Sequence, residues 1–176
     1  MSKSNLLEPW LRETLIEVPS VLRAVLHALQ LAKEDIEQWC ANLSEEELNA
    51  RPAGLPSLAF QIRHIAGSID RLLTYAEGMS LNDNQLLALK TEERQANKDE
   101  LFAGFSGALE SAAKRIQKFR SHELEEKRSV GKKQLPTTVG GLLIHVADHT
   151  QRHVGQAITT AKVLEHVKVT MKDEVN

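Results

Sequence analysis

Four long segments of this chain repeat apolar residues at steps of three and four, and this repeat constrains the fold more than any other feature. A period near 3.6 residues is typical of an amphipathic helix that buries one face. Four such helices bury their apolar faces most simply against one another. The sequence therefore predicts an all-α four-helix bundle, with helices at roughly Ser20–Leu43, Ser57–Gly78, Lys98–Ser121 and from Thr137 or Thr138 toward the C-terminus.

The segments between these helices are predicted to be short or irregular. The stretch EPWLRETLIEV precedes the first helix and has the pattern of a short extra N-terminal helix. Residues 80–98 are polar around a short LLAL island, which indicates a loop with one or two helical turns. Residues 122–137 are charged and are predicted to be a connector. A chain of 176 residues can bury one core, so we expect a single domain over residues 1–176.

Composition excludes several classes of protein. The net charge is only −2, with Lys and Arg spread among Asp and Glu, so we expect no nucleic-acid partner. No apolar run approaches the ~20 residues that cross a bilayer, and MSKSNLLEPW lacks the apolar stretch of a secretion signal, so we expect no membrane partner. The single cysteine, Cys40, cannot form an intrachain disulfide, and we interpret it as a small buried hydrophobe. A cytoplasmic location is expected.

The histidines of the last helix are the strongest chemical signal in the chain. His145, His149 and His153 recur every four residues in LLIHVADHTQRHVGQA. Side chains four apart lie on one face of a helix, so an adjacent pair can bind one metal ion. Residues 145 and 153 are about 12 Å apart along the axis, which is too far for one small ion to bind both. Two adjacent histidines must therefore be chosen.

A helical wheel favours the second pair. A buried stripe is predicted along one face of the last helix, and it includes Val146, Thr150 and Val154. His153 lies roughly 55° from the centre of this stripe, His149 roughly 95° and His145 roughly 135°. His149 and His153 therefore point inward, whereas His145 turns toward solvent.

Two imidazoles rarely complete a metal site, because zinc and similar ions usually take at least three protein ligands. Among the other histidines, His122 lies in a charged stretch and His166 lies near the end of the chain. His27 and His64 both belong to predicted helices with apolar faces, and the pattern alone leaves both open as the third ligand.

Two short motifs in this chain resemble the DinB/YfiT-like superfamily of metal-binding four-helix bundles. They are HIA, at His64, and H-x-x-x-H-x-G-Q, which begins at His149 and includes Gly155 and Gln156. The resemblance covers nearly the whole chain and implies His64, His149 and His153 as the metal ligands, with no ligand role for His145. Gly155 is expected to allow a close helix approach. Further polar residues near the histidines have equally good surface or packing interpretations, and these are Arg71, Tyr75, Arg152 and Gln156.

The same resemblance implies a function. Members of the superfamily use low-molecular-weight thiols in metal-dependent transfer to electrophiles, and others are regarded as metal-dependent hydrolases. We therefore expect a divalent transition metal, zinc or nickel, with a thiol and a small-molecule substrate, and a homodimer as in many relatives. Thiol transfer comes first because the superfamily has established examples of it, and hydrolysis by a metal-bound water comes second. Separately, neither Asp70 nor Asp148 is placed to act as the general base that a hydrolase usually needs. A non-catalytic bundle, with a structural metal or none, is the third reading. No catalytic residue is assigned.

Overall fold

The computed structural model describes residues 7–173, with side chains for residues 7–168. The chain folds into helices and one small hairpin. In chain order the elements are η1 (Pro9–Leu11), α1 (Ser20–Cys40), α2 (Glu45–Asn49), η2 (Pro52–Gly54), α3 (Leu58–Ala76), α4 (Asp83–Lys90), α5 (Lys98–Ile116), η3 (Ser121–Glu123), β1 (Lys127–Val130), β2 (Leu135–Thr138) and α6 (Val139–Asp173). Among the described residues, no helix is both long enough and apolar enough to cross a membrane.

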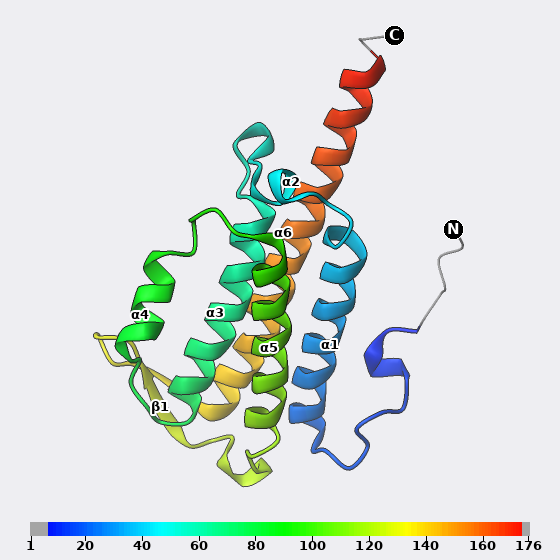
Figure 1. Cartoon of the computed structure of the whole chain (residues 1–176). Helices are drawn as coiled ribbons and strands as arrows, with labels where there is room; N and C mark the ends of the chain where they lie inside the picture. Colours follow the sequence, from blue (N-terminus) through cyan, green and yellow to red (C-terminus); the bar gives the residue numbers. More distant parts are fainter. Residues whose placement is uncertain (1–6, 174–176) are drawn as a thin grey trace.

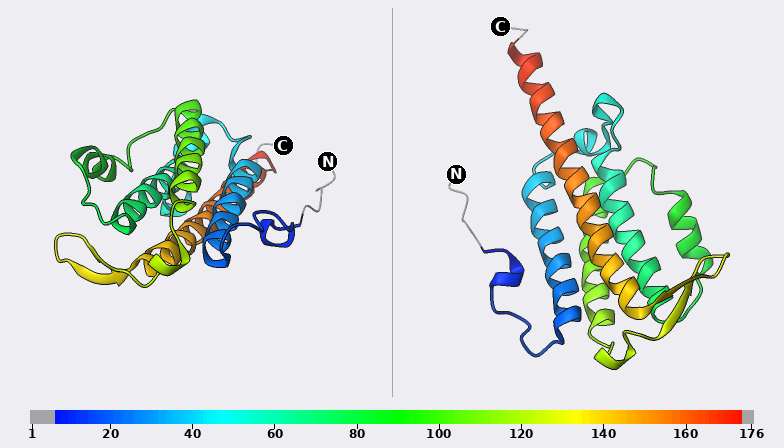
Figure 2. Two further views of the ribbon diagram at one scale, coloured as in Figure 1. Left: turned by 90° about the horizontal axis from the view of Figure 1, so that it is seen from below. Right: turned by 180° about the vertical axis from the view of Figure 1, so that it is seen from behind.

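Four long helices lie side by side and form the predicted bundle (Figure 1). Helices α1 and α6 run in one direction, and α3 and α5 run in the other. Because α3 and α5 are parallel, the chain between them must return along the bundle, and this crossover contains α4. Helix α6 packs against both α1 and α3, as the view from behind also shows (Figure 2). The packing of α6 against α3 brings together the two segments that carry the histidine motifs.

The core is aliphatic and draws on all four long helices. Ile36, Ile65 and Val146 are completely buried, and Phe105 is 2% exposed. On α6, every residue of the stripe that the wheel predicted is buried, from Val139 to Leu164. This burial fixes the rotation of α6, so the residues on the flank of the stripe face α3.

Side-chain caps set where several helices begin. The hydroxyl of Ser57 accepts a hydrogen bond from Phe60 N at 3.1 Å, which caps α3 as predicted. The hydroxyl of Thr138 accepts one from Gly141 N at 3.0 Å, which selects Thr138 over Thr137 as the residue that caps α6. At the other end of α3, Gly78 adopts a positive φ of 79°, a conformation that glycine reaches without strain.

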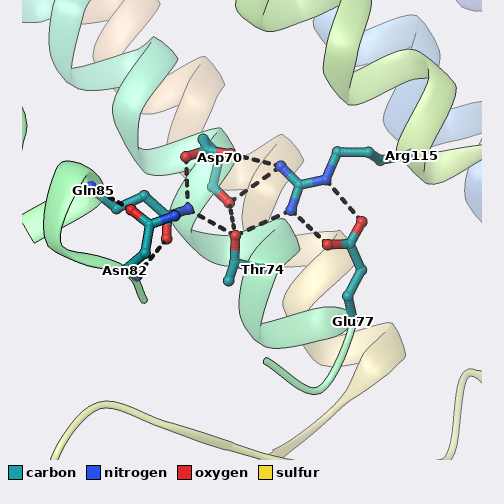
Figure 3. A network of polar contacts seen from close by, with 6 residues as sticks. All are labelled: Asp70, Thr74, Glu77, Asn82, Gln85 and Arg115. Carbon is teal, nitrogen blue, oxygen red and sulfur yellow. Dashed lines mark hydrogen bonds and ion pairs between the residues drawn. The ribbon is translucent and has the colours of Figure 1, made fainter. Parts of the chain in front are cut away.

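A polar network holds α4 on the outside of the bundle (Figure 3). The guanidinium of Arg115 donates to both carboxylate oxygens of Glu77, at 2.8 and 2.7 Å, and to Asp70 Oδ1 at 2.6 Å. From α4, Gln85 Nε2 donates to Asp70 Oδ2 at 2.7 Å and to Thr74 Oγ1 at 2.8 Å. Helix α4 has no buried residue, so these polar contacts rather than apolar packing fix its place.

Two predicted segments differ in the structure. The N-terminal helix is a single 3-10 turn, because Glu13 and Leu15 adopt positive φ values of 54° and 57° that no helix tolerates. The predicted connector contains the hairpin β1–β2, in which Lys127 pairs with Thr138 and Val130 with Leu135. These strands have four residues each, which is too short for a clear alternating pattern.

Candidate metal centre

The structure brings together three histidines that are far apart in the sequence. His64 lies on α3, and His149 and His153 lie one turn apart on α6. One nitrogen from each ring can be chosen so that all three lie within 4.8 Å of one another. These are the three residues that the resemblance implied as ligands, and their nitrogens could hold a metal ion.

The other histidines considered as ligands lie outside this group. The side chain of His145 is 47% exposed, and its Nδ1 lies 3.6 Å from Asp148 Oδ2, as expected for a residue that turns toward solvent. His27 is buried on α1, and its Nε2 lies 3.1 Å from Thr14 Oγ1. Of the two histidines that the pattern had left open, His64 lies beside the pair on α6 and His27 does not.

The donor nitrogens fit a small divalent ion. Nε2 of His64 lies 3.0 Å from Nε2 of His149. The ring centroid of His153 lies 4.4 Å from the ring centroid of His64 and 4.5 Å from that of His149. Two nitrogens that share a tetrahedral ion, with bonds of about 2.0–2.1 Å, are about 3.3 Å apart. Three imidazoles are also a donor set that zinc and nickel accept. The residues present therefore suit the metal that the resemblance implied.

Two buried polar side chains orient the rings. Glu92 Oε2 lies 2.7 Å from His64 Nδ1, and Gln61 Oε1 lies 2.6 Å from His153 Nδ1. An acceptor at Nδ1 favours the tautomer with its proton there and leaves Nε2 free for a metal, an arrangement common around metal-binding histidines. Gln61 is fully buried, and the side chain of Glu92 is 6% exposed, so both acceptors are held away from water.

Burial favours the neutral forms of His149 and His153. Burial, the largest cause, and the charges of the neighbouring His153, His64, His145 and Arg152 together lower the pKa of His149 to about 4. Burial also lowers the pKa of His153, with a smaller contribution from His64. Neutral imidazole is the form that binds metal, so near neutral pH little proton competition is expected at these two residues.

Glu92 carries the negative charge of the site. Burial alone would raise the pKa of its carboxyl, but the hydrogen bond with His64 and the charge of Arg71 outweigh burial and lower it. Arg71 Nη1 lies 2.8 Å from Glu92 Oε1, so the carboxylate stands between a histidine and an arginine. Sequence reasoning missed Glu92, because it lies in the loop after α4, where no periodicity indicates the direction of a side chain.

A comparison with family profiles found that residues 28–157 match the DinB superfamily. The chain belongs to the DinB superfamily. A crystal structure of a conserved protein from Enterococcus faecalis resembles this DinB chain with a TM-score of 0.68 and 20% identity, over 84% of this chain and 99% of that one. That likeness supports the fold. No functionally curated protein matches the chain significantly.

Gly155, in the second motif of the DinB resemblance, does not have the role that was expected of it. A Cβ atom at Gly155 would meet no atom within 4 Å, so this glycine does not permit a close helix approach. Its place in the motif has no packing explanation in the structure. Phe60, one turn before His64, stacks on one face of the His64 ring, with the ring centroids 5.4 Å apart and the ring planes at 19°.

Proposed function

We propose that this DinB protein binds one divalent transition-metal ion through His64, His149 and His153, and uses it to activate a low-molecular-weight thiol for transfer to a small electrophile. The convergence of three imidazole nitrogens from α3 and α6 carries the proposal. Zinc and nickel are the ions we propose, since both accept neutral nitrogen ligands. Within the described part of the chain no fourth histidine, cysteine or carboxylate joins the group, which is typical of catalytic sites rather than structural ones.

Each residue of the site has a definite task in this proposal. A bound divalent ion supplies a Lewis acid, which makes a thiol or a water molecule beside it more acidic. His149 and His153 offer neutral nitrogens, because burial lowers their pKa. Glu92 and Gln61 hold protons at Nδ1 of His64 and His153, so that Nε2 of each ring carries the lone pair.

The positions of the carboxylates favour thiol transfer over hydrolysis. A hydrolase usually needs a carboxylate free to accept a proton from the attacking water. Glu92 is already engaged by His64 and Arg71, and Asp148 accepts a hydrogen bond from Arg152 at 2.7 Å on the exposed side of α6. A thiol made more acidic by a bound ion would release its proton to solvent water, so thiol transfer would need no such base in the protein.

Metal analysis tests the binding step. We expect about one metal per chain in the wild-type protein, and its loss in His64→Ala, His149→Ala and His153→Ala variants that circular dichroism shows to be folded. His145→Ala is the matched control, since it removes an exposed histidine one turn away on the same helix and should leave the metal content unchanged. A wild type that stays metal-free after reconstitution would refute the proposal.

An activity assay separates the reactions. The metal-loaded protein is offered an electrophile with and without low-molecular-weight thiols. A rate that requires the thiol supports transfer, and turnover in water alone supports hydrolysis. A folded, metal-loaded protein with neither activity would indicate a structural metal.

A further inference from the structure

We propose that Glu92 is a positioning residue of the metal centre, and that the loop between α4 and α5 contributes to the site by carrying this residue. This inference rests on the proposed function and deepens it, because it assigns a role to a residue that neither sequence motif contains. Glu92 would act through His64 and would not bind the metal. The argument depends on three features, namely the two partners of its carboxylate, the glycine beside them and the anchors of the loop.

The two oxygens of Glu92 have different partners. Oε2 lies 2.7 Å from His64 Nδ1, and Oε1 lies 2.8 Å from Arg71 Nη1. Because a carboxylate can only accept, a neutral His64 must carry its proton at Nδ1 and direct the lone pair of Nε2 toward His149, 3.0 Å away. A carboxylate in this position also makes the imidazole a more basic ligand.

Arg71 pairs with the other oxygen of this acceptor. Its side chain is 10% exposed, and a buried arginine stabilises an ionised carboxylate beside it. The pair lies directly against α3 because residue 67 is a glycine. A Cβ atom there would be 2.7 Å from Arg71 Nη1 and 3.0 Å from Glu92 Oε1, so any other residue at this position would force the end of the Arg71 side chain to shift.

The loop that carries Glu92 is anchored at Glu92 itself and at two later residues. Arg63 Nη1 donates to the carbonyls of Glu92 and Arg94, at 2.9 and 2.6 Å. Asn49 bonds the backbone of Ala96 twice, accepting from its N–H at 2.8 Å and donating to its carbonyl at 2.9 Å. These contacts fix the backbone that carries the Glu92 carboxylate, and preorganisation of this kind is what a positioning residue requires.

Glu92 also neutralises Arg71, so a purely structural role has to be distinguished from a positioning role. In a purely structural role, Glu92 variants would lower the stability of the fold and leave the intrinsic metal affinity of the folded protein unchanged. In the positioning role, loss of the acceptor lets the His64 ring rotate and lets its proton move from Nδ1 to Nε2, so metal binding becomes weaker. Metal affinity and the tautomer of His64 are therefore the decisive measurements.

The first experiment measures zinc affinity by competition with a chromophoric chelator. We expect Glu92→Ala to bind about 10–100-fold more weakly than wild type, which is the usual cost of losing such a partner. Glu92→Gln keeps an acceptor oxygen and loses the charge, so its affinity should lie between the two. The neighbouring Glu93→Gln removes the same charge from an exposed side chain and should bind like wild type. Wild-type affinity in folded Glu92→Ala would overturn the inference.

The second experiment does not depend on metal or on the stability of a variant. Histidine nitrogen NMR of the metal-free wild-type protein, at mildly alkaline pH, reports which ring nitrogen of His64 carries the proton. The inference requires the proton at Nδ1, and a proton at Nε2 would overturn it. If wild type shows the expected tautomer but binds no zinc or nickel, the proposed function fails and the inference falls with it. If wild type binds metal but the tautomer or the affinities are wrong, the inference alone fails.

Discussion

Cys40, the only cysteine of the chain, should be almost inert toward thiol reagents in the folded protein. It is the last residue of α1 and is completely buried. Burial raises the pKa of its thiol from 9.0 to about 12. The thiolate is the reactive form, and a rise of about three pKa units lowers its fraction about a thousandfold at any pH below both values. Exclusion of the reagent from the core slows the reaction further.

The assay is modification by a chromogenic disulfide reagent, followed in native buffer and in guanidinium chloride. We expect one fast thiol per chain in the denatured protein, and a native rate at least about a thousandfold slower. Cys40→Ala gives the zero-thiol baseline and should keep any thiol-dependent activity, because Cys40 is not a nucleophile of the site. Native modification within about tenfold of the denatured rate, with unchanged circular dichroism, would refute the reasoning from burial.

Three further predictions concern acidity, orientation and the α4 network. Folding lowers the pKa of His149 from 6.5 to about 4, so between these pH values the unfolded chain binds a proton that the folded chain does not. The unfolding free energy of the metal-free protein should therefore fall as pH falls from 6.5 toward 4. His149→Gln should make this dependence on pH weaker in urea titrations. Gln61→Leu removes the acceptor for His153 Nδ1 and should weaken zinc binding about 10–100-fold in the chelator competition. Arg115→Met leaves Asp70 and Glu77 without their cation and should cost about 1–3 kcal/mol of unfolding free energy in urea.

Each of these predictions has an outcome that contradicts it. An equal pH slope in wild type and His149→Gln would mean that the ring of His149 is solvated in the folded protein. Zinc affinity unchanged in folded Gln61→Leu would mean that His153 needs no partner at Nδ1. An Arg115→Met protein as stable as wild type would mean that the network in Figure 3 contributes no net stability.

The long helices could be predicted because their signals are local. The apolar repeat of α6 alone determines its buried face, and every residue of the predicted stripe is buried. The same repeat distinguishes His145, which is exposed, from His149 and His153, which face α3. A helix repeats its geometry every turn, so sequence spacing translates directly into direction in space.

The residues that orient the histidines could not be predicted in this way. Glu92 reaches His64 across 28 positions of the sequence, and Gln61 reaches His153 across 92. Both contacts depend on how α3, α6 and the α4–α5 loop are placed in three dimensions. The hairpin β1–β2 escaped prediction for a different reason, since its pairing depends on a turn and on the end of α3, where Arg128 Nε donates to Ala76 O at 2.8 Å.

The ligands of the candidate centre come from two helices, with His64 and His149 separated by 85 positions of the chain. A metal held between them acts as a removable crosslink, and the unfolded chain offers no such preformed set. Binding to the folded state alone adds about 2.7 kcal/mol at a concentration one hundred times the dissociation constant. For a chain of this size, that corresponds to a rise in melting temperature of roughly 5–11 °C. Melting curves recorded over a panel of metal salts would thus rank the ions by affinity before any substrate is known.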